Sequence, residues 1–168
     1  MKTVSKLILI LGLFAFSFNA EAQKLGHIDF AKLYAVMPGL DTVQIKYKDF
    51  AEQLKKQIGA MQTELENKYA DYQANSANMS PIIKQTKEKE MSDLNERIQA
   101  FNTQAQQELS AKETELTTPI IEKARKAINE VAKEHSYSYI FNSAEGLLLF
   151  AQESDDITAL VKKKLGIK

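Results

Sequence analysis

Apolar residues recur at intervals of three and four along the middle of the chain. Between residues 40 and 72 they are Leu40, Val43, Tyr47, Phe50, Leu54, Ile58, Met61, Leu65, Tyr69 and Tyr72, with charged and amide side chains between them. This spacing places one apolar stripe on one face of a helix. From Leu54 onward the pattern repeats every 11 residues, which favours a nearly straight or slightly right-handed coiled coil over a strict heptad. The pattern predicts one long helix over residues 40–75.

The apolar stripe stops at a short polar segment and then returns. It resumes at Ile83, Met91, Leu94, Ile98, Phe101, Ala105, Leu109 and Leu116. The polar segment ends in Ser80-Pro81, and proline suits the first position of a helix with a serine as its N-cap. The helical stretches before and after the segment are equally long, about 54 Å each at roughly 1.5 Å per residue. We therefore predict an antiparallel helical hairpin over residues 40–118, with its tip near residues 75–81.

Shorter elements are predicted at both ends of the chain. Residues 25–30 alternate as a strand does, and Asp29 is placed to cap a following helix that Pro38 and Gly39 end. At Pro119 the returning helix either kinks or restarts with Thr118 as its cap. An amphipathic helix follows, then a period-two strand over residues 136–142, a turn, and a further apolar strand over residues 147–150. A last helix follows, capped by Asp155 or Asp156 and ending at Gly166.

These elements predict an α+β fold that is mostly α. Residues 23–39 and 119–168 form a small β-rich body, and the hairpin is an arm that projects from it. The body has few strands and open sheet edges, and a two-helix arm buries its stripe on one side only. Both features predict a homo-oligomer that assembles through the body. The candidate oligomerisation residues are Ile28, Tyr139, Ile140, Phe141, Leu147, Leu148 and Leu149.

The first 22 residues have the pattern of a secretory signal peptide. Lys2 and Lys6 precede an apolar run over residues 7–18, and Ala20-Glu21-Ala22 is a small-x-small cleavage pattern. The alternative is an uncleaved membrane anchor, for which the apolar run is short. We expect an exported protein, in the periplasm rather than the outside medium. The absence of cysteine means that no disulfide stabilises it and no thiol carries chemistry.

The sequence offers little chemistry. The two histidines, His27 and His135, lie apart and have no ligand spacing, and no glycine-rich phosphate loop or nucleophile motif is present. We predict no catalytic residue, no metal and no cofactor. The 22 basic and 22 acidic side chains balance, which argues against nucleic acid as a partner. The remaining candidates are apolar residues near the tip, which either contact a partner or pack locally: Tyr69, Tyr72, Met79, Ile82, Ile83 and Met91.

Two stretches resemble a known family. The opening "LGHIDFAKLYAVMPG" and the closing "PIIEKARKAINEVAKEHSYSYIFNSAEGLLLFAQESDDITALVKKKLG" are similar to the Skp/OmpH family of periplasmic chaperones. The resemblance implies a homotrimer in which short strands assemble into a small central barrel and three helical hairpins project as tentacles around a cavity. It further implies a chaperone without enzymatic activity that holds unfolded outer-membrane β-barrel proteins without ATP.

One departure from the family limits what the resemblance implies. Members with basic tips are linked to membrane or lipopolysaccharide contact, whereas residues 68–90 here carry four lysines against three acidic side chains. Lipopolysaccharide binding is therefore not expected. The alternatives are a structural coiled-coil or adaptor protein that binds one folded partner, and an amphipathic-helix protein that lies on lipid, which the charge-balanced arms disfavour.

Overall fold

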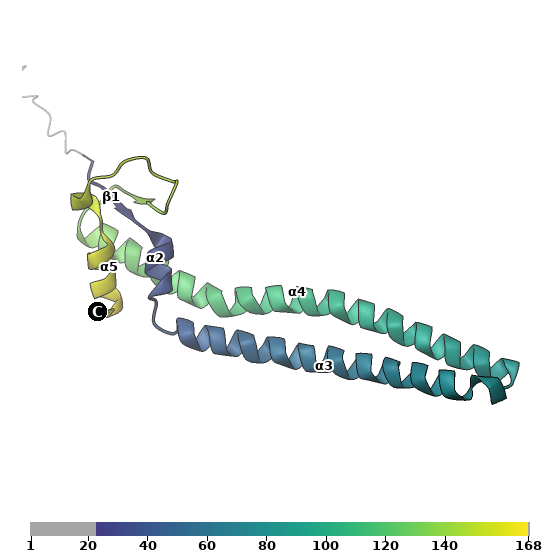
Figure 1. The fold of residues 1–168 in the computed structure, drawn as a ribbon. Helices are drawn as coiled ribbons and strands as arrows, with labels where there is room; N and C mark the ends of the chain where they lie inside the picture. The colour runs from purple at the N-terminus through teal and green to yellow at the C-terminus, as the bar shows by residue number, and fades with distance from the viewer. Residues whose placement is uncertain (1–22, 168) are drawn as a thin grey trace, which may run out of the picture.

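The chain forms a small body with one long arm (Figure 1). The computed structural model describes residues 23–167, and the predicted signal peptide at residues 1–22 lies outside them. In chain order the elements are strand β1 (Leu25–Ile28), helix α2 (Phe30–Ala35), helix α3 (Leu40–Asn75), the 3-10 turn η1 (Ser76–Asn78), helix α4 (Pro81–Glu134), strand β2 (Tyr139–Asn142), the 3-10 turn η2 (Glu153–Asp155) and helix α5 (Thr158–Leu165). α3 and the first part of α4 run side by side as the arm, and the other elements gather at its base.

The arm is an antiparallel helical hairpin. α3 spans the residues that the apolar spacing predicts, Leu40–Asn75. The buried side chains between the two helices, here called the arm seam, are Leu54, Met91, Leu94, Ile98 and Ala105. Most other residues of the stripe are only half-buried, because each helix has one neighbour and the stripe is wider than the line of contact. The arm therefore keeps partly accessible apolar surface along its length.

Local side-chain chemistry sets the turn at the tip. Ser80 has an extended backbone, and its hydroxyl oxygen accepts a hydrogen bond from the Ile83 N–H at 3.4 Å. Pro81 takes the first position of α4, where no backbone N–H is needed. The predicted start of the returning helix is thus confirmed.

α4 continues through Pro119 from the arm into the body. Of the two alternatives at this proline, the structure excludes a restart. Proline has no N–H for the carbonyl four residues earlier and crowds that turn. The hydroxyl groups of Thr117 and Thr118 donate to the carbonyl oxygens of Glu113 and Thr114, each at 2.7 Å. One helix therefore belongs to both the arm and the body.

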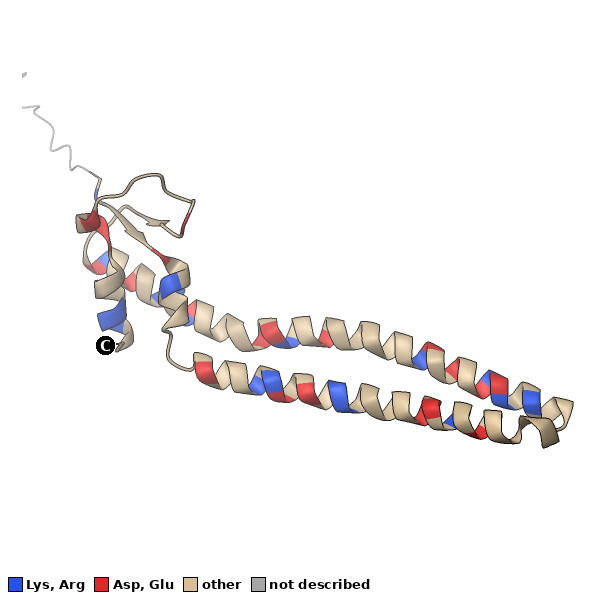
Figure 2. Cartoon of the chain, in the orientation of Figure 1, with Lys and Arg blue, Asp and Glu red and all other residues tan. Residues whose placement is uncertain are grey.

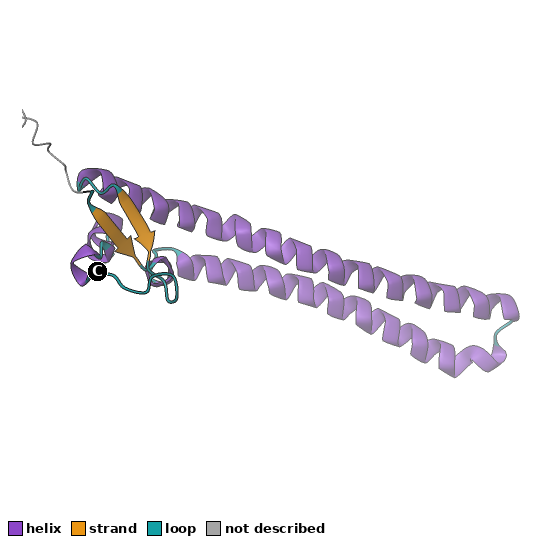
Figure 3. Ribbon diagram, turned by 90° about the horizontal axis from the view of Figure 1, so that it is seen from above, coloured by secondary structure: helices purple, strands orange, loops and turns teal. Residues whose placement is uncertain are grey.

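β1 and β2 form a two-stranded parallel sheet at the base of the arm (Figure 3). Leu25 pairs with Tyr139 and Ile28 with Asn142. His27 also bridges to Asp156, which lies on the other side of β1. β2 is therefore the edge strand, and its outer edge has no strand partner among residues 23–167.

The hydrophobic core lies in the body, where β1, α2, α4 and α5 meet. Its buried side chains are Ile28, Leu33, Met37, Ala124, Ala127, Val131, Ile157 and Val161. The Asp29 carboxylate caps α2 by accepting a hydrogen bond from the Lys32 N–H at 3.0 Å, as predicted, and this bond lowers the pKa of Asp29. The Asp156 carboxylate likewise accepts from the N–H of Thr158, the first residue of α5, at 2.7 Å.

One predicted strand does not form. Residues 147–150 lie in an irregular loop between β2 and η2, so the described part of the chain contains two strands rather than about three. An extended segment is stable as a strand only when its backbone groups find partners on a neighbouring strand. Within one chain this apolar run has no such neighbour.

Candidate functional site

Exposed apolar side chains gather at the two ends of the molecule. At the distal end of the arm Tyr69, Ile82 and Ile83 are exposed, and we call these residues the tip surface. In the body we define the body surface as Leu25, Tyr139, Phe141, Leu147, Leu149 and Phe150, which are also exposed. Soluble proteins rarely keep large side chains grouped in water without a use for them. These two surfaces are the candidates for function.

The tip surface results from where the two helices end. Ile82 and Ile83 lie in the first turn of α4, and Ile82 is 72% exposed. Adjacent residues on a helix point in directions about 100° apart, so both cannot enter the narrow contact with α3. Tyr69 lies on the last turns of α3 and is also exposed. The fold therefore leaves three bulky apolar groups in water at the end of a rigid arm.

Polar contacts join the helices near the tip. The Tyr72 hydroxyl donates to the Glu88 carboxylate, and acceptance by Glu88 raises the pKa of Tyr72. Two further contacts are ion pairs, Lys68 with Glu90 at 3.1 Å and Lys87 with Asp71 at 3.2 Å. These side chains keep the arm ends together while the tip surface stays open.

The six residues predicted to contact a partner fall into three groups. Tyr69, Ile82 and Ile83 are exposed. Tyr72 and Met79 are half-buried, and the Tyr72 hydroxyl is already bonded to Glu88. Met91 is only 4% exposed because it packs in the arm seam, so it offers no surface to a partner.

The body surface lies on the side of the sheet away from the core. The rings of Tyr139 and Phe141 stack with their centroids 6.4 Å apart, and Leu25 lies opposite Tyr139 in the strand register. Ile140, between them on β2, points to the other side and packs against the core. The strand thus places aromatic side chains in solvent on one face and an aliphatic one in the core on the other.

The predicted oligomerisation residues also divide by burial. Tyr139, Phe141, Leu147 and Leu149 are exposed, and Leu148 and Ile140 are half-buried. Ile28 is 2% exposed and belongs to the core of its own chain, so it cannot line a contact by itself. Sequence reasoning missed Leu25 and Phe150. Phe150 could have been found as the end of the same apolar run, and Leu25 only through its pairing with Tyr139.

The His27 side chain forms hydrogen bonds to two distant residues of a loop, and the sequence did not predict these bonds. Its Nε2 atom lies 2.9 Å from the Gln152 carbonyl oxygen, and its Nδ1 atom 3.0 Å from the Ser143 hydroxyl oxygen. Because a carbonyl only accepts, Nε2 carries a proton and donates. One ring on β1 therefore holds both ends of the loop that carries most of the body surface.

The described residues show no cluster of histidine and acidic side chains arranged to hold a metal ion. Helices within residues 23–167 are all too short or too polar to cross a membrane. Charged side chains of both signs are interspersed along both helices of the arm (Figure 2). The arrangement suits weak, adaptable contact with apolar chains.

The sequence and the fold are both similar to those of known proteins. Residues 24–165 match a family model described as outer membrane protein (OmpH-like). A search of curated proteins found no match. A solved structure described as an OmpH-like outer membrane chaperone, from Caulobacter crescentus CB15, has a TM-score of 0.73 and 15% sequence identity, and the likeness covers 85% of this chain and 83% of that chain. At this identity the structural likeness concerns the fold alone.

Proposed function

The chain belongs to the family of OmpH-like outer membrane proteins, and we propose that it is an ATP-independent holdase that binds unfolded outer-membrane proteins in the periplasm. The observation that carries this proposal is the tip surface, three large apolar side chains held in water at the end of a long arm. The family supports a chaperone role, and a chaperone of this kind requires no catalytic residue. The predicted signal peptide and the family both support the periplasm.

Recognition of an unfolded client has particular physical requirements. An unfolded chain has no fixed arrangement of hydrogen-bonding groups, so the contacts must be apolar, numerous and individually weak. Partial burial of one tyrosine or isoleucine contributes on the order of 1 kcal/mol. The tip surface and the half-buried stripe along the arm supply such contacts. The interspersed charges keep the surrounding surface hydrated, so that a bound client stays mobile.

We propose that the functional unit is a homo-oligomer that assembles through the body. The exposed body surface and the open edge of β2 support this, because both remain in water in a single chain. The resemblance found in the sequence implies three copies. Arms that project from a shared body would enclose a space, and a client held there would be shielded from other unfolded chains.

An aggregation assay tests the function directly. Several unrelated outer-membrane proteins are diluted from denaturant, and light scattering is followed with and without this protein. A holdase suppresses scattering for all of them without ATP. An adaptor with one folded partner, the main alternative, suppresses none. Absence of suppression at a several-fold molar excess would refute the proposal.

A further inference from the structure

The middle of the arm has a stretch without charged side chains on both of its helices. Residues 57–63 of α3 and residues 98–107 of α4 contain no Asp, Glu, Lys or Arg, although charged residues flank both segments. Each segment is longer than one helical turn of about 3.6 residues, so it is uncharged on every face. We call these two segments the amide belt.

The two segments of the amide belt lie opposite each other in the hairpin. Lys68 pairs with Glu90 on the side of the tip, and Lys112 lies over the Phe50 ring on the side of the body. The antiparallel register between these two pairs brings the segments to the same level of the arm. Both helices are accordingly tan at the middle of the arm (Figure 2).

Side-chain amides are the main polar groups of the belt. The exposed amides are Gln57, Gln62, Gln99, Gln104, Gln106 and Gln107. The side-chain hydrogen bonds described within the belt are those of Thr103 with the Gln99 carbonyl oxygen and of Gln104 with Glu108. The other exposed amides therefore have donors and acceptors that the described part of the chain does not use.

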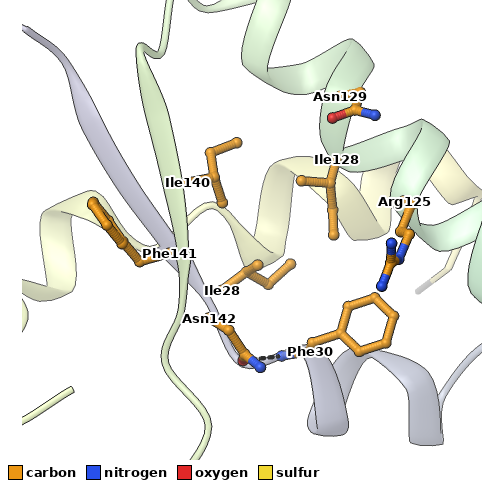
Figure 4. A pocket seen from close by; sticks show the side chains of 8 residues that line it. All are labelled: Ile28, Phe30, Arg125, Ile128, Asn129, Ile140, Phe141 and Asn142. Atoms are coloured by element: carbon orange, nitrogen blue, oxygen red, sulfur yellow. Dashed lines mark hydrogen bonds between the residues drawn. The ribbon is translucent and has the colours of Figure 1, made fainter. Parts of the chain in front are cut away.

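The cavity in the body is not a comparable surface for a client. This cavity of about 430 Å³ lies beside the free edge of β2, where Ile140 and Asn142 line it together with Ile128 of α4 (Figure 4). That edge belongs to the proposed contact between copies, so assembly would bring a second copy over the cavity. The arm projects away from the body and remains accessible (Figure 1).

We propose that an extended segment of an unfolded client lies against the amide belt, with its backbone N–H and C=O groups hydrogen-bonded to the glutamine side chains. A glutamine amide both donates and accepts, as the peptide group does. Backbone groups are common to all clients, so this contact does not depend on the client sequence. The inference rests on the proposed holdase function and adds where the client is held and through which groups.

The lack of charge makes the belt easier to dehydrate than the rest of the arm. A client that covers a lysine or a glutamate must displace tightly held water, at a much higher cost than over a neutral amide. Ile58, Met61 and Phe101 are half-buried within the belt, and they add apolar contact for the side chains of the client.

Other occupants fit the belt less well. Nucleic acid and anionic lipid are bound through cations, and the belt has none. The arm of a second copy would pack against a further apolar stripe, whereas the exposed positions of the belt are mostly amides. An unfolded chain needs neither cations nor a stripe.

Charges of either sign placed in the belt test the inference. Gln57→Glu with Gln62→Glu should raise the dissociation constant for an unfolded outer-membrane protein about fivefold or more, because two charges must then be dehydrated. Gln57→Lys with Gln62→Lys should weaken binding as well. Attraction or repulsion between arm and client would instead change direction with the sign of the charge. Fluorescence titration with two labelled clients of opposite net charge measures the affinity.

Gln44 and Gln53 provide the matched control. Both are exposed glutamines of α3 that lie among charged residues outside the belt. The same glutamate and lysine pairs at these positions should leave the affinity unchanged. Glutamine, glutamate and lysine have similar helix propensities, so the helix should be kept, which circular dichroism and sedimentation velocity check. Belt pairs that weaken binding no more than the control pairs, or weaken it with one sign only, would overturn the inference.

NMR of glutamine side chains gives a second readout on the parent protein. With ¹⁵N-glutamine labelling, addition of unlabelled client should shift the side-chain amide resonances of Gln57, Gln62 and Gln99 more than those of Gln44 and Gln53. Equal shifts in both groups would mean that the belt is not a preferred site. If the belt resonances shift on dilution of the protein without client, a second copy occupies the belt and the inference fails.

The inference and the proposed function fail in different ways. A parent protein that binds and protects unfolded clients, but whose belt pairs behave like the control pairs, would refute the belt and leave the holdase standing. A parent protein that binds clients through the belt without suppressing aggregation would refute the holdase alone. A parent protein that binds no unfolded client would refute both.

Discussion

Tyr72 on α3 donates its hydroxyl hydrogen to the carboxylate of Glu88 on α4, across the end of the arm. The last side chain of the arm seam before the tip is Met91. Beyond it no side chain of the described arm is fully buried, and the polar contacts between the helices are Tyr72–Glu88 and the ion pairs of Lys68 with Glu90 and Lys87 with Asp71. The tip therefore lacks the buried apolar side chains of the arm seam, and it should open more easily than the rest of the arm.

The Tyr72–Glu88 contact predicts the behaviour of the tip in alkali. The folded-state pKa of Tyr72 is raised above its ordinary value of about 10. The contact is therefore fully present below that value and is lost as pH rises through the folded-state pKa. The ring-carbon resonance of Tyr72 in NMR should titrate above the ordinary range, and Glu88→Gln should move its midpoint down. A midpoint that Glu88→Gln leaves unchanged would mean that the two side chains do not interact in solution.

The tip surface predicts distributed client binding. Tyr69→Ser, Ile82→Ser or Ile83→Ser alone should weaken affinity for an unfolded outer-membrane protein only a few-fold, since each contact contributes about 1 kcal/mol or less. The triple variant should lose an order of magnitude or more. Fluorescence titration with a labelled client measures the affinity, and sedimentation checks that the oligomeric state is kept.

Ile45→Ser is the matched control for the tip variants. Ile45 is 61% exposed on α3, but it lies near the body, at the opposite end of the arm from Ile82. It should change client affinity less than Ile82→Ser does. Equal effects at the two positions would show that exposed apolar area anywhere on the arm binds clients. An unchanged triple variant would place the binding surface nearer the body.

Features that depend on nearby residues could be predicted from the sequence. The bounds of α3, the Ser80-Pro81 start of α4 and the Asp29 cap of α2 each depend on side chains within a few positions. The continuation of α4 through Pro119 was less predictable. A proline usually ends or kinks a helix, whereas here two threonine hydroxyls bond to carbonyls of the preceding turn.

Features that depend on distant residues could not be predicted. The parallel pairing of Leu25 with Tyr139 joins two strands that lie more than one hundred residues apart in the sequence. Burial of Met91 depends on which of several apolar residues near the tip faces α3, and the spacing alone does not decide that. The segment over residues 147–150 has a strand-like composition without a strand partner in its own chain. The hydrogen bonds of His27 with Ser143 and Gln152 also join residues that are distant in the sequence, so no local pattern indicated them.

The end of α4 offers a stability prediction. Ser136, just past the helix, has a φ of 56°, in the left-handed region that glycine adopts without strain. Ser136→Gly should therefore raise the free energy of unfolding by about 0.5–1 kcal/mol, measured by urea denaturation. Ser138→Gly is the control, since Ser138 is not among the described residues with positive φ, and it should be neutral or destabilising. A gain at both positions would exclude backbone strain as the cause.

Substitutions at two neighbouring residues of β2 should distinguish an effect on folding from an effect on assembly. Ile140 packs against the core, whereas Tyr139 is 57% exposed on the opposite face. A carboxylate in place of Ile140 would be partly buried against the apolar core, at a cost of about 2 kcal/mol or more, so Ile140→Asp should strongly destabilise the body. Tyr139→Asp leaves the new charge hydrated in a single chain, so the chain should stay folded and the oligomer should dissociate. Circular dichroism and sedimentation velocity distinguish the outcomes. If Tyr139→Asp stays fully assembled, this face of the sheet lies outside the contact between copies. If Ile140→Asp gives folded monomers, Ile140 acts at the interface rather than in the core.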